Sequence, residues 1–369
     1  MGDFQVQFVN LFVVECVSTC YTILMKRLSI IVPCYNVENY IDRCLTSLTE
    51  QTLSQAAYEI ILVDDASTDT TWQHITAWEA KYPELILAVH CDENGKMGRA
   101  RNIGLSYATG EYVGFADSDD WVEKDMFEAL LSEAEAGGQD VVICRHLRDH
   151  GEDFSKLADK GSGKIYRAVI DTEEKRRQLI IENTMSYAVW DKVIRRSLLT
   201  ENEIVFPEGL AYEDIYFGSL LQLYAKRIAK IDKVYYHYFV NQKSTVLARE
   251  TGYHKDIMTV NRMVLQAYQE RGVWEKYHDE LELDLLFTWY LATVKVICLR
   301  FEKPPYDMFC RLKEDILANM PGCVNNKYIK ACMREFHQLL MQLLTCYVTP
   351  AMLSQIAEQY KQYLHIEQK

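Results

Sequence analysis

Short β-branched runs alternate with amphipathic stretches from Leu28 to Cys144, and this alternation limits the fold more than any other feature of the sequence. Apolar runs bounded by turn residues are typical of strands, and apolar residues at helical spacing are typical of helices. Their regular succession predicts a parallel sheet covered by helices. The expected strands are Leu28–Val32, Glu59–Val63, Leu85–Val89, Tyr112–Ala116 and Val141–Cys144.

Helical spacing occupies the intervals between these strands. One helix is expected over Tyr40–Leu48 and a second after the capping residues Ser67–Asp69. A third is expected from near Gly98 and a fourth from near Lys124. The 369 residues exceed what one core usually organises, so a second domain is expected as well.

The second domain is predicted to be helical. We expect an α/β domain over residues 27–248 and a helical region over residues 249–369. Within the helical region, Leu285–Leu299 is apolar but contains Lys295 and is too short to span a bilayer, which favours a buried helix. The apolar stripe in Phe336–Leu344 indicates packing within the region, with contact to a membrane surface or a second copy as the alternative.

Two segments are expected to lie outside the packed elements. Residues 1–26 are interpreted as an extension, because Asp3 stands in place of a basic flank and Glu15 interrupts the apolar run, which makes a poor signal peptide and a poor membrane span. A weak membrane or partner contact is the alternative for this segment. The polar, glycine-rich stretch Gly151–Gly163 predicts a loop.

The charge balance limits the partners of the chain. The 53 acidic residues outnumber the 40 basic ones and give a net charge of −13. Nucleic acid is not an expected partner, since binding to its backbone depends on cations that displace counterions. A polyanion must instead meet a local patch, a metal ion or helix N-termini. The 11 cysteines are scattered without a C-x-x-C pair, which predicts buried thiols in a reducing compartment and no zinc site.

Acidic clusters follow two of the expected strands and recur later in the chain. Asp64-Asp65 comes after Glu59–Val63, Asp117–Asp120 comes after Tyr112–Ala116, and Glu213-Asp214 lies further on. Ligands of open α/β sheets bind at the carboxyl ends of the strands. The clusters therefore mark the expected site.

The spacing of Asp117 and Asp119 allows both carboxylates to serve one site. In an extended segment these residues point to the same face with Cα atoms about 6.6 Å apart. Direct ligation of one metal by both would need the chain to curl, so a division between metal and sugar is the simpler expectation. The alternative is that the cluster merely ends a strand and caps the next helix.

A basic helix start is expected to face this cluster. Gly95 and Gly98 can bring backbone close to a phosphate, and the helix N-terminus adds partial positive charge. Arg99 and Arg101 supply planar guanidinium groups for phosphate oxygens or a base edge. An acidic pair with a metal on one side and this helix start on the other would bracket a diphosphate. Each arginine could equally be a surface cation.

Four motifs then follow one another in a defined order. They are Ser29–Asn36 with Glu38 and Tyr40, Glu59–Asp69, Gly98–Gly104 and Gly110–Trp121. Together they resemble the family 2 glycosyltransferases of the bacterial polysaccharide type, over about Leu28 to Thr245. The resemblance implies a GT-A fold, a Rossmann-like mixed sheet flanked by helices, with a C-terminal helical subdomain.

The resemblance also implies roles for individual residues. Asp65 would bind the uracil edge, Arg101 would lie beside the base or phosphates, and Asp117 would approach the ribose. Asp119, together with Asp117, would ligate Mg²⁺ or Mn²⁺ on the diphosphate. The residues implied in nucleotide-sugar binding are Pro33, Tyr35, Asn36, Glu38, Asp65, Arg101, Asp117 and Ser118.

The later motifs of the family match more loosely. Asp214 is implied as the catalytic base, and the residues implied on the acceptor side are Asp120, Trp190, Lys192 and Glu213. Trp190 could instead be plain core packing, and Glu213-Asp214 a solvated helix start. Because Phe239 stands where an arginine is expected, His237 and Lys243 are the candidates for the cation that completes the phosphate site.

The expected function is inverting transfer of a sugar from a nucleotide-diphosphate sugar, with a UDP-sugar favoured, to a hydroxyl of a glycan or lipid-linked acceptor. The resemblance places this reaction in cell-surface polysaccharide biosynthesis. The alternatives are a non-catalytic nucleotide-sugar-binding subunit and a Mg²⁺-dependent phosphotransfer enzyme with Asp65 as nucleophile. A cytoplasmic location is expected, with peripheral contact to the inner membrane face where the acceptor is lipid-linked and homo-oligomer contact through the helical tail as a further expectation.

Overall fold

The computed structural model describes residues 26–149, 160–240 and 249–367 of the chain. The apolar stretch expected before the first strand, most of the Gly151–Gly163 loop and the candidate cation Lys243 lie outside the described residues.

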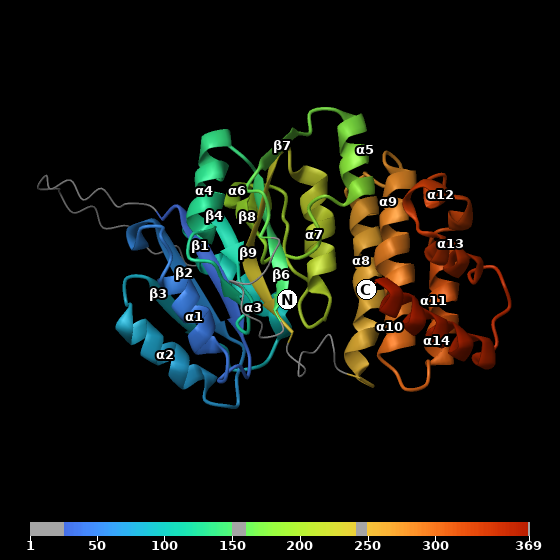
Figure 1. Ribbon diagram of the computed structural model, residues 1–369, viewed down its shortest axis with the longest axis horizontal. Helices are drawn as coiled ribbons and strands as arrows, with labels where there is room; N and C mark the ends of the chain where they lie inside the picture. Colours follow the sequence, from blue (N-terminus) through green and yellow to red (C-terminus); the bar gives the residue numbers. More distant parts are fainter. Residues whose placement is uncertain (1–25, 150–159, 241–248, 368–369) are drawn as a thin grey trace, which may run out of the picture.

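A mixed sheet forms the centre of the α/β part (Figure 1). Within the described residues it has nine strands, eight of them in the order β3-β2-β1-β4-β8-β6-β9-β5, with β7 paired to β9. Strands β1 to β4 run parallel, while β8 lies antiparallel to both β4 and β6. The strands are β1 (Leu28–Cys34), β2 (Tyr58–Asp64), β3 (Ile86–His90), β4 (Tyr112–Phe115), β5 (Trp121–Val122), β6 (Val141–Asp149), β7 (Ile165–Val169), β8 (Lys192–Arg195) and β9 (Arg227–Phe239).

The strand register brings the predicted acidic clusters to one edge. Cys34 pairs with Asp64 on β2, and Ile31 pairs with Phe115 on β4, so the carboxyl ends of β1, β2 and β4 lie side by side. All five predicted strands are confirmed, and β6 extends beyond its prediction to Asp149. The prediction of a parallel sheet is wrong in part, because β8 lies between β4 and β6 and runs antiparallel to both.

Helices cover both faces of the sheet because alternate strand residues point to opposite sides. Ile30 and Val32 of β1 join the core under α1, α2 and α4, whereas Ile31 joins the core under α3, α6 and α7. Helix α3 approaches β1 closely, since a Cβ on Gly104 would lie 2.4 Å from the Ile31 side chain. The helices of this part are α1 (Ile41–Thr49), α2 (Thr71–Lys81), α3 (Lys96–Tyr107), α4 (Met126–Gly137), α5 (Glu173–Glu182), α6 (Arg196–Glu201) and α7 (Glu213–Tyr224), with the short turn η1 (Gln55–Ala57).

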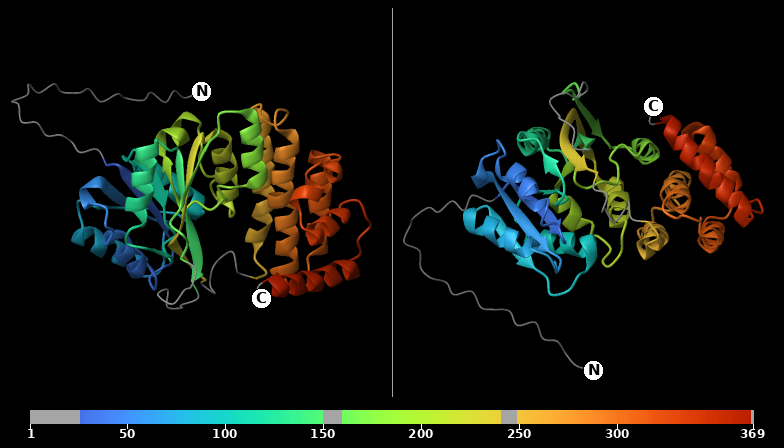
Figure 2. Two further views of the ribbon diagram at one scale, coloured as in Figure 1. Left: turned by 45° about the horizontal axis from the view of Figure 1, so that its top comes forward. Right: turned by 60° about the horizontal axis from the view of Figure 1, so that its bottom comes forward.

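The chain beyond Arg249 is helical, as predicted, and packs beside α7 (Figure 2). One continuous apolar core runs from Ile31 in the sheet to Tyr360 in the last helix. Its elements are η3 (Gly252–Lys255), α8 (Asp256–Glu270), α9 (His278–Leu285), the π-helical η4 (Leu286–Leu291), α10 (Ala292–Leu299), α11 (Tyr306–Asn319), η5 (Cys323–Asn325), α12 (Ile329–Cys332), α13 (Glu335–Gln342) and α14 (Pro350–Glu367).

The two apolar stretches predicted in this region behave differently. Leu285–Leu299 is the buried helical stretch that was expected. In the second stretch Leu340 and Leu344 are buried, but Leu339 is 51% exposed. Among the helices of the described residues, none combines the length and the apolar character needed to cross a membrane.

Candidate active site

The candidate site lies where β1, β2 and β4 end and where α3 and α7 begin. Five segments far apart in the sequence contribute to it. They are the β1–α1 loop, the end of β2, the start of α3, the turn after β4 and the start of α7.

The two carboxylates at the end of β2 have different partners. Asp64 is buried and its Oδ2 lies 2.7 Å from Nδ1 of His90. Asp65 accepts the backbone N–H of Gly95 at 2.9 Å, which ties β2 to the start of α3. Burial raises the pKa of Asp65, while the N–H groups of Gly95 and Lys96 oppose that rise. Asp65 therefore lies beside the glycine-rich helix start.

The β1–α1 loop is held by the segment that follows β2. Asn36 adopts a φ of 51°, and its Oδ1 accepts the Thr68 N–H at 2.8 Å. Glu38 accepts hydrogen bonds from both the backbone and the hydroxyl of Thr70, and these bonds lower its pKa. Tyr35 is 47% exposed, which leaves its ring available to a ligand.

Pro33 differs from its loop neighbours because it lies inside β1. It is buried and pairs in register with Val63 of β2. The Pro33 side chain therefore packs beneath the site and does not face solvent.

The Asp117–Asp120 segment is a turn and not an extended run. The N–H of Asp120 bonds to the carbonyl of Asp117 at 3.0 Å, and Arg43 of α1 donates to the carbonyl of Asp119 at 2.7 Å. The expectation that Asp117 and Asp119 lie in an extended segment is wrong, because the chain curls into a turn at these residues. Ser118 is buried within the same turn.

Arg101 is the central cation of the site. It is buried on α3, donates to Asp117 Oδ1 at 2.8 Å and donates to Glu213 at the start of α7. Its guanidinium also lies 5.4 Å from the ring centroid of Phe206. The charges of Asp117 and Glu213 raise the pKa of Arg101 against the opposing effect of burial. Arg101 therefore joins three elements and is not a surface cation.

Replacing Arg101 with Met is expected to lower the free energy of unfolding by about 3–5 kcal/mol, because two poorly solvated carboxylates lose their counter-charge. Urea denaturation measures this change. Arg99→Met is the matched control, since Arg99 lies on the same helix and donates to the carbonyl of Glu93 at the surface. An equal loss of stability in both variants would contradict the central role of Arg101.

Asp214 stands next to this ion-paired group. It is the second residue of α7, follows Glu213, and accepts the N–H of Ile215 at 3.0 Å. Loss of solvation and the charge of Glu213 raise the pKa of Asp214 to about 7. A carboxylate with a pKa near the working pH is suited to general-base catalysis.

The residues predicted on the acceptor side divide into an aromatic surface and buried supports. The Trp190 ring stacks on Tyr236 with centroids 4.4 Å apart and remains partly exposed. Lys192 is buried, with Nζ 2.6 Å from Asp191 Oδ1. Its charge is thus paired with the neighbouring residue at the start of β8, which makes Lys192 a buried support and not a contact for an acceptor.

Asp120 is also a support. Its carboxyl group is 1% exposed and accepts the Tyr236 hydroxyl and the Phe239 N–H, both at 2.7 Å. Burial, together with the charges of Asp117 and Asp119, raises the pKa of Asp120 to about 9. Asp120 is therefore too buried for the predicted contact with an acceptor, and it instead holds β9 against the turn.

His237 does not face the phosphate site. It is fully buried, stacks on Trp121 with centroids 3.4 Å apart, and has Nε2 2.8 Å from Glu123. The proposal that it completes the phosphate site is therefore wrong for this structure.

The Asp117–Asp120 turn suits a hard divalent cation. In the described residues, no group of three or more His, Cys, Asp or Glu side chains is placed to hold a metal ion alone. Mg²⁺, however, usually takes only one or two protein carboxylates, with substrate phosphates and water as its other ligands. Asp117 and Asp119 supply that donor set on a single turn.

Tyr236 is a residue whose importance the sequence did not reveal. Its hydroxyl accepts the Asp117 N–H at 3.0 Å and donates to Asp120, while its ring supports Trp190. The only signal was its place in the aromatic run 235–238, which pattern alone cannot separate from core packing.

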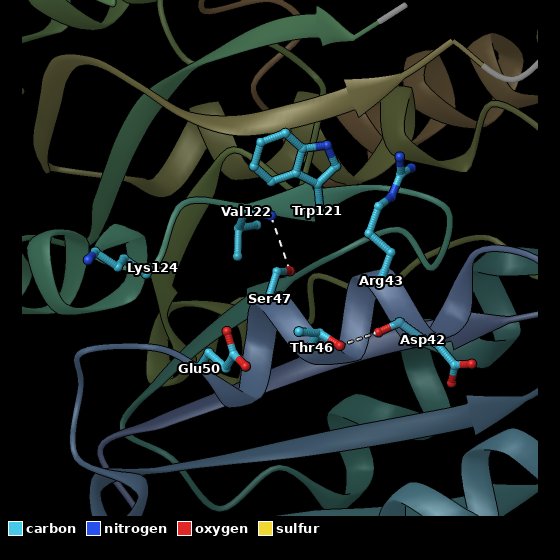
Figure 3. Close-up of a pocket in the computed structure, with 8 residues that line it drawn as sticks. All are labelled: Asp42, Arg43, Thr46, Ser47, Glu50, Trp121, Val122 and Lys124. Carbon is cyan, nitrogen blue, oxygen red and sulfur yellow. Dashed lines mark hydrogen bonds between the residues drawn. The ribbon is translucent and has the colours of Figure 1, made fainter. Parts of the chain in front are cut away.

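A hollow of about 440 Å³ lies behind the turn, on the outer side of α1 (Figure 3). Ser47 accepts the Val122 N–H there at 3.2 Å, and Arg43 reaches from the hollow toward the turn. These contacts hold the turn from behind. The residues that line the hollow are Asp42, Arg43, Thr46, Ser47, Glu50, Trp121, Val122 and Lys124.

The chain is similar to known proteins. The model of the family described as Glycosyl transferase family 2 matches residues 29–201. A Bacillus subtilis protein that bears the name glycosyltransferase EpsH is 30% identical over 257 residues, which are 69% of this chain and 72% of that protein. The poly(ribitol-phosphate) beta-N-acetylglucosaminyltransferase TarS of Staphylococcus aureus is 28% identical over 71% of this chain, which spans 44% of TarS.

Solved structures show the same fold. The crystal structure of S. aureus TarS 1–349 superposes with a TM-score of 0.66 at 24% identity and covers 91% of both chains. The structure of that fragment in complex with UDP-GlcNAc gives a TM-score of 0.65 at 22% identity, covering 91% of this chain and 92% of the other. The expected fold class, with its mixed sheet, flanking helices and C-terminal helical region, is confirmed.

Proposed function

This chain belongs to glycosyl transferase family 2, and from that premise we propose that it is a metal-dependent, inverting glycosyltransferase. The donor is a nucleotide-diphosphate sugar and the acceptor is a hydroxyl group of a glycan or lipid-linked saccharide. The proposed role is in cell-surface polysaccharide biosynthesis, in the cytoplasm where activated sugars are made.

One observation carries this proposal. Asp214, with its pKa of about 7, directly follows Glu213, and Glu213 shares the Arg101 guanidinium with Asp117. We call the sheet edge where the donor would bind, at the carboxyl ends of β1, β2 and β4, the donor edge. Asp214 is thus connected to Asp117 on the donor edge through Glu213 and Arg101. This connection supports the proposal that Asp214 accepts a proton beside the expected position of the sugar diphosphate.

The proposed reaction follows from these positions. Asp214 takes the proton of the acceptor hydroxyl as that oxygen attacks the anomeric carbon. The bond from the anomeric carbon to the diphosphate oxygen breaks on the opposite face, so the configuration inverts and a nucleoside diphosphate leaves. Asp119 and Asp117 would hold Mg²⁺ or Mn²⁺, which when bound offsets the charge of the leaving diphosphate.

The loop residues would hold the nucleotide. We assign the base to Asp65 with Tyr35, Asn36 and Glu38 around it, and the ribose to Asp117. The TarS fragment was crystallised with UDP-GlcNAc, which supports a UDP-sugar as donor here. Trp190 would offer an aromatic face to the acceptor, since partly exposed rings stack on the apolar faces of sugars.

UDP-GlcNAc with Mn²⁺ is expected to raise the melting temperature, because a ligand at 100 times its Kd stabilises the folded state by about 2.7 kcal/mol. Differential scanning fluorimetry with UDP-GlcNAc, UDP-glucose, GDP-mannose and UDP, each with Mn²⁺ or EDTA, measures the change. EDTA should remove most of it.

Release of UDP in the presence of saccharide acceptors then separates binding from catalysis. Stabilisation without any release would favour a non-catalytic nucleotide-sugar-binding subunit. No stabilisation by any of the nucleotides would contradict the proposed donor site.

A further inference from the structure

The segment that carries the candidate base is held by residues of the helical region. Helix α7 lies between the sheet and α8 (Figure 1), and the base segment, Leu210–Asp214, leads into α7 and includes its first two residues. Two side chains from the start of the helical region reach this segment. They are His254 of η3 and Asp256, the first residue of α8.

Asp256 links the base segment to the start of α3. Its Oδ2 accepts the backbone N–H of Ala211 at 3.0 Å and the ammonium group of Lys96 at 2.9 Å. Lys96 is the first residue of α3, which carries Arg101, and its Nζ also lies 4.8 Å from the ring centroid of Tyr253. One carboxylate oxygen therefore contacts both α3 and the segment that leads into α7, the two elements that meet in the Arg101–Glu213 ion pair.

His254 holds the same segment one residue further on. Its Nδ1 lies 2.9 Å from the Tyr212 hydroxyl, and the imidazole is fully buried. Tyr212 and Lys96 both adopt left-handed backbone conformations, with φ values of 65° and 62°. Such conformations in non-glycine residues persist where surrounding contacts hold them. Both residues are held here by η3 and α8.

Helix α3 also holds the residues just before the base segment. A Cβ on Gly98 of α3 would lie 2.2 Å from the carbonyl oxygen of Pro207, and the N–H of Gly209 bonds to the carbonyl of Gly95 at 3.1 Å. The segment is thus fixed on one side by α3 and on the other by η3 and α8.

We propose that Asp256 and His254 are positioning residues, which hold the base segment so that Asp214 faces the donor edge. The proposal rests on the proposed role of Asp214 as base. It makes the start of the helical region a working part of the active site, although the matched family region ends at residue 201.

The first test is hydrogen exchange, which needs no substrate. Asp256→Ala and Tyr212→Phe are expected to speed amide exchange in the peptide that spans Ala211–Asp214 by about tenfold, because protection depends on the contacts that close the segment. Asp315→Ala is the matched control, since Asp315 of α11 forms an ion pair of similar geometry with Arg262 of α8, 3.1 Å long, away from the base segment. Unchanged exchange in the two variants, or equal acceleration in the control, would overturn the proposal.

The second test is kinetic. Misplacement of a catalytic group by about 1 Å can cost up to about 10²-fold, so Asp256→Ala and Tyr212→Phe should lower kcat by about tenfold or more. The KM for the donor should stay within about twofold, since the change falls on the reacting geometry. A kcat within about twofold of the wild type in both variants would contradict the positioning role.

The pH profile separates positioning from a general loss of stability. The charged groups that act on Asp214 are Glu213, Arg101 and Asp117, and Tyr212 interacts with Asp214 as well. Because Tyr212→Phe removes one of these groups, the pH profile is compared for Asp256→Ala, which leaves all four in place. Water that enters a loosened segment would relieve the desolvation that raises the pKa of Asp214, so the acid limb of the kcat profile should move to lower pH in Asp256→Ala. An acid limb at the wild-type pH would count against the proposal.

A conservative variant guards against simple unfolding. Asp256→Asn keeps an oxygen that can accept the Ala211 N–H, so it should lose less activity than Asp256→Ala. Equal loss in both would overturn the role assigned to this hydrogen bond. If the wild type transfers no sugar at all, the proposed function fails, while hydrogen exchange still decides whether the segment is held as proposed.

Discussion

Asp214→Asn is expected to lower kcat by about 10²–10⁴-fold, the range that general-base catalysis contributes. Asn has nearly the same shape but cannot take the proton of the acceptor hydroxyl. The affinity for the donor should be unchanged, because Asp65, Arg101 and Asp117 remain in place. Initial rates of UDP release and isothermal titration with the donor measure the two effects.

The pH dependence of kcat provides a second readout of the same substitution. Since Asp214 must be ionised to act as base and has a pKa of about 7, wild-type kcat should fall as the pH drops below about 7. The residual reaction of Asp214→Asn should lack this acid limb. Asp171→Asn, which alters an exposed carboxylate paired with Lys175, is the control and should keep the wild-type rate and profile. A wild-type rate in Asp214→Asn would show that another group is the base.

Asp119→Ala is expected to abolish metal-dependent transfer. A cation on the diphosphate contributes several kcal/mol to stabilising the charge of the leaving group, and Asp119 is the proposed protein ligand of that cation. Donor affinity should fall as well, because the donor and the cation bind together. Titration with UDP-GlcNAc in Mn²⁺ and in EDTA measures the coupling.

The comparison of conditions makes this prediction specific. In EDTA the wild type and Asp119→Ala should bind the donor with similar, weak affinity, whereas only the wild type should gain from Mn²⁺. Asp307→Ala, at an exposed position in the first turn of α11, should behave as the wild type. Donor affinity that does not respond to EDTA in the wild type would contradict the metal site.

Much of the donor edge could be predicted from sequence because the relevant signals are local. The apolar run Glu59–Val63 indicates a buried strand, and the polar residues that follow must lie at its carboxyl end. Asp65 and the helix start at Lys96 therefore fall on the same edge, where the structure joins them through the Gly95 N–H. The pattern of apolar residues that indicates a strand is local, so it can be recognised without knowing which distant segments pack against the strand.

The partners of the charged side chains could not be predicted in the same way. Arg101 and Glu213 are far apart in the chain, and nothing in the spacing of either residue indicates that they pair. Asp120 and Lys192 had the same sequence signal as exposed site residues, yet both are buried with partners of their own. Whether a polar residue faces solvent depends on what packs over it, which is a property of the whole fold.

The amino-acid pattern alone thus determined five of the nine strands in the described sheet, the edge at which the acidic clusters gather and the helical nature of the C-terminal region, because hydrophobic periodicity records which side of each element is buried. Tertiary structure decided the rest. It curled Asp117–Asp120 into a turn, joined α3 to α7 through Arg101, and placed Asp256 of α8 on the base segment. These features depend on which distant segments meet, and a buried charge acquires its partner and its pKa only when the chain has packed around it.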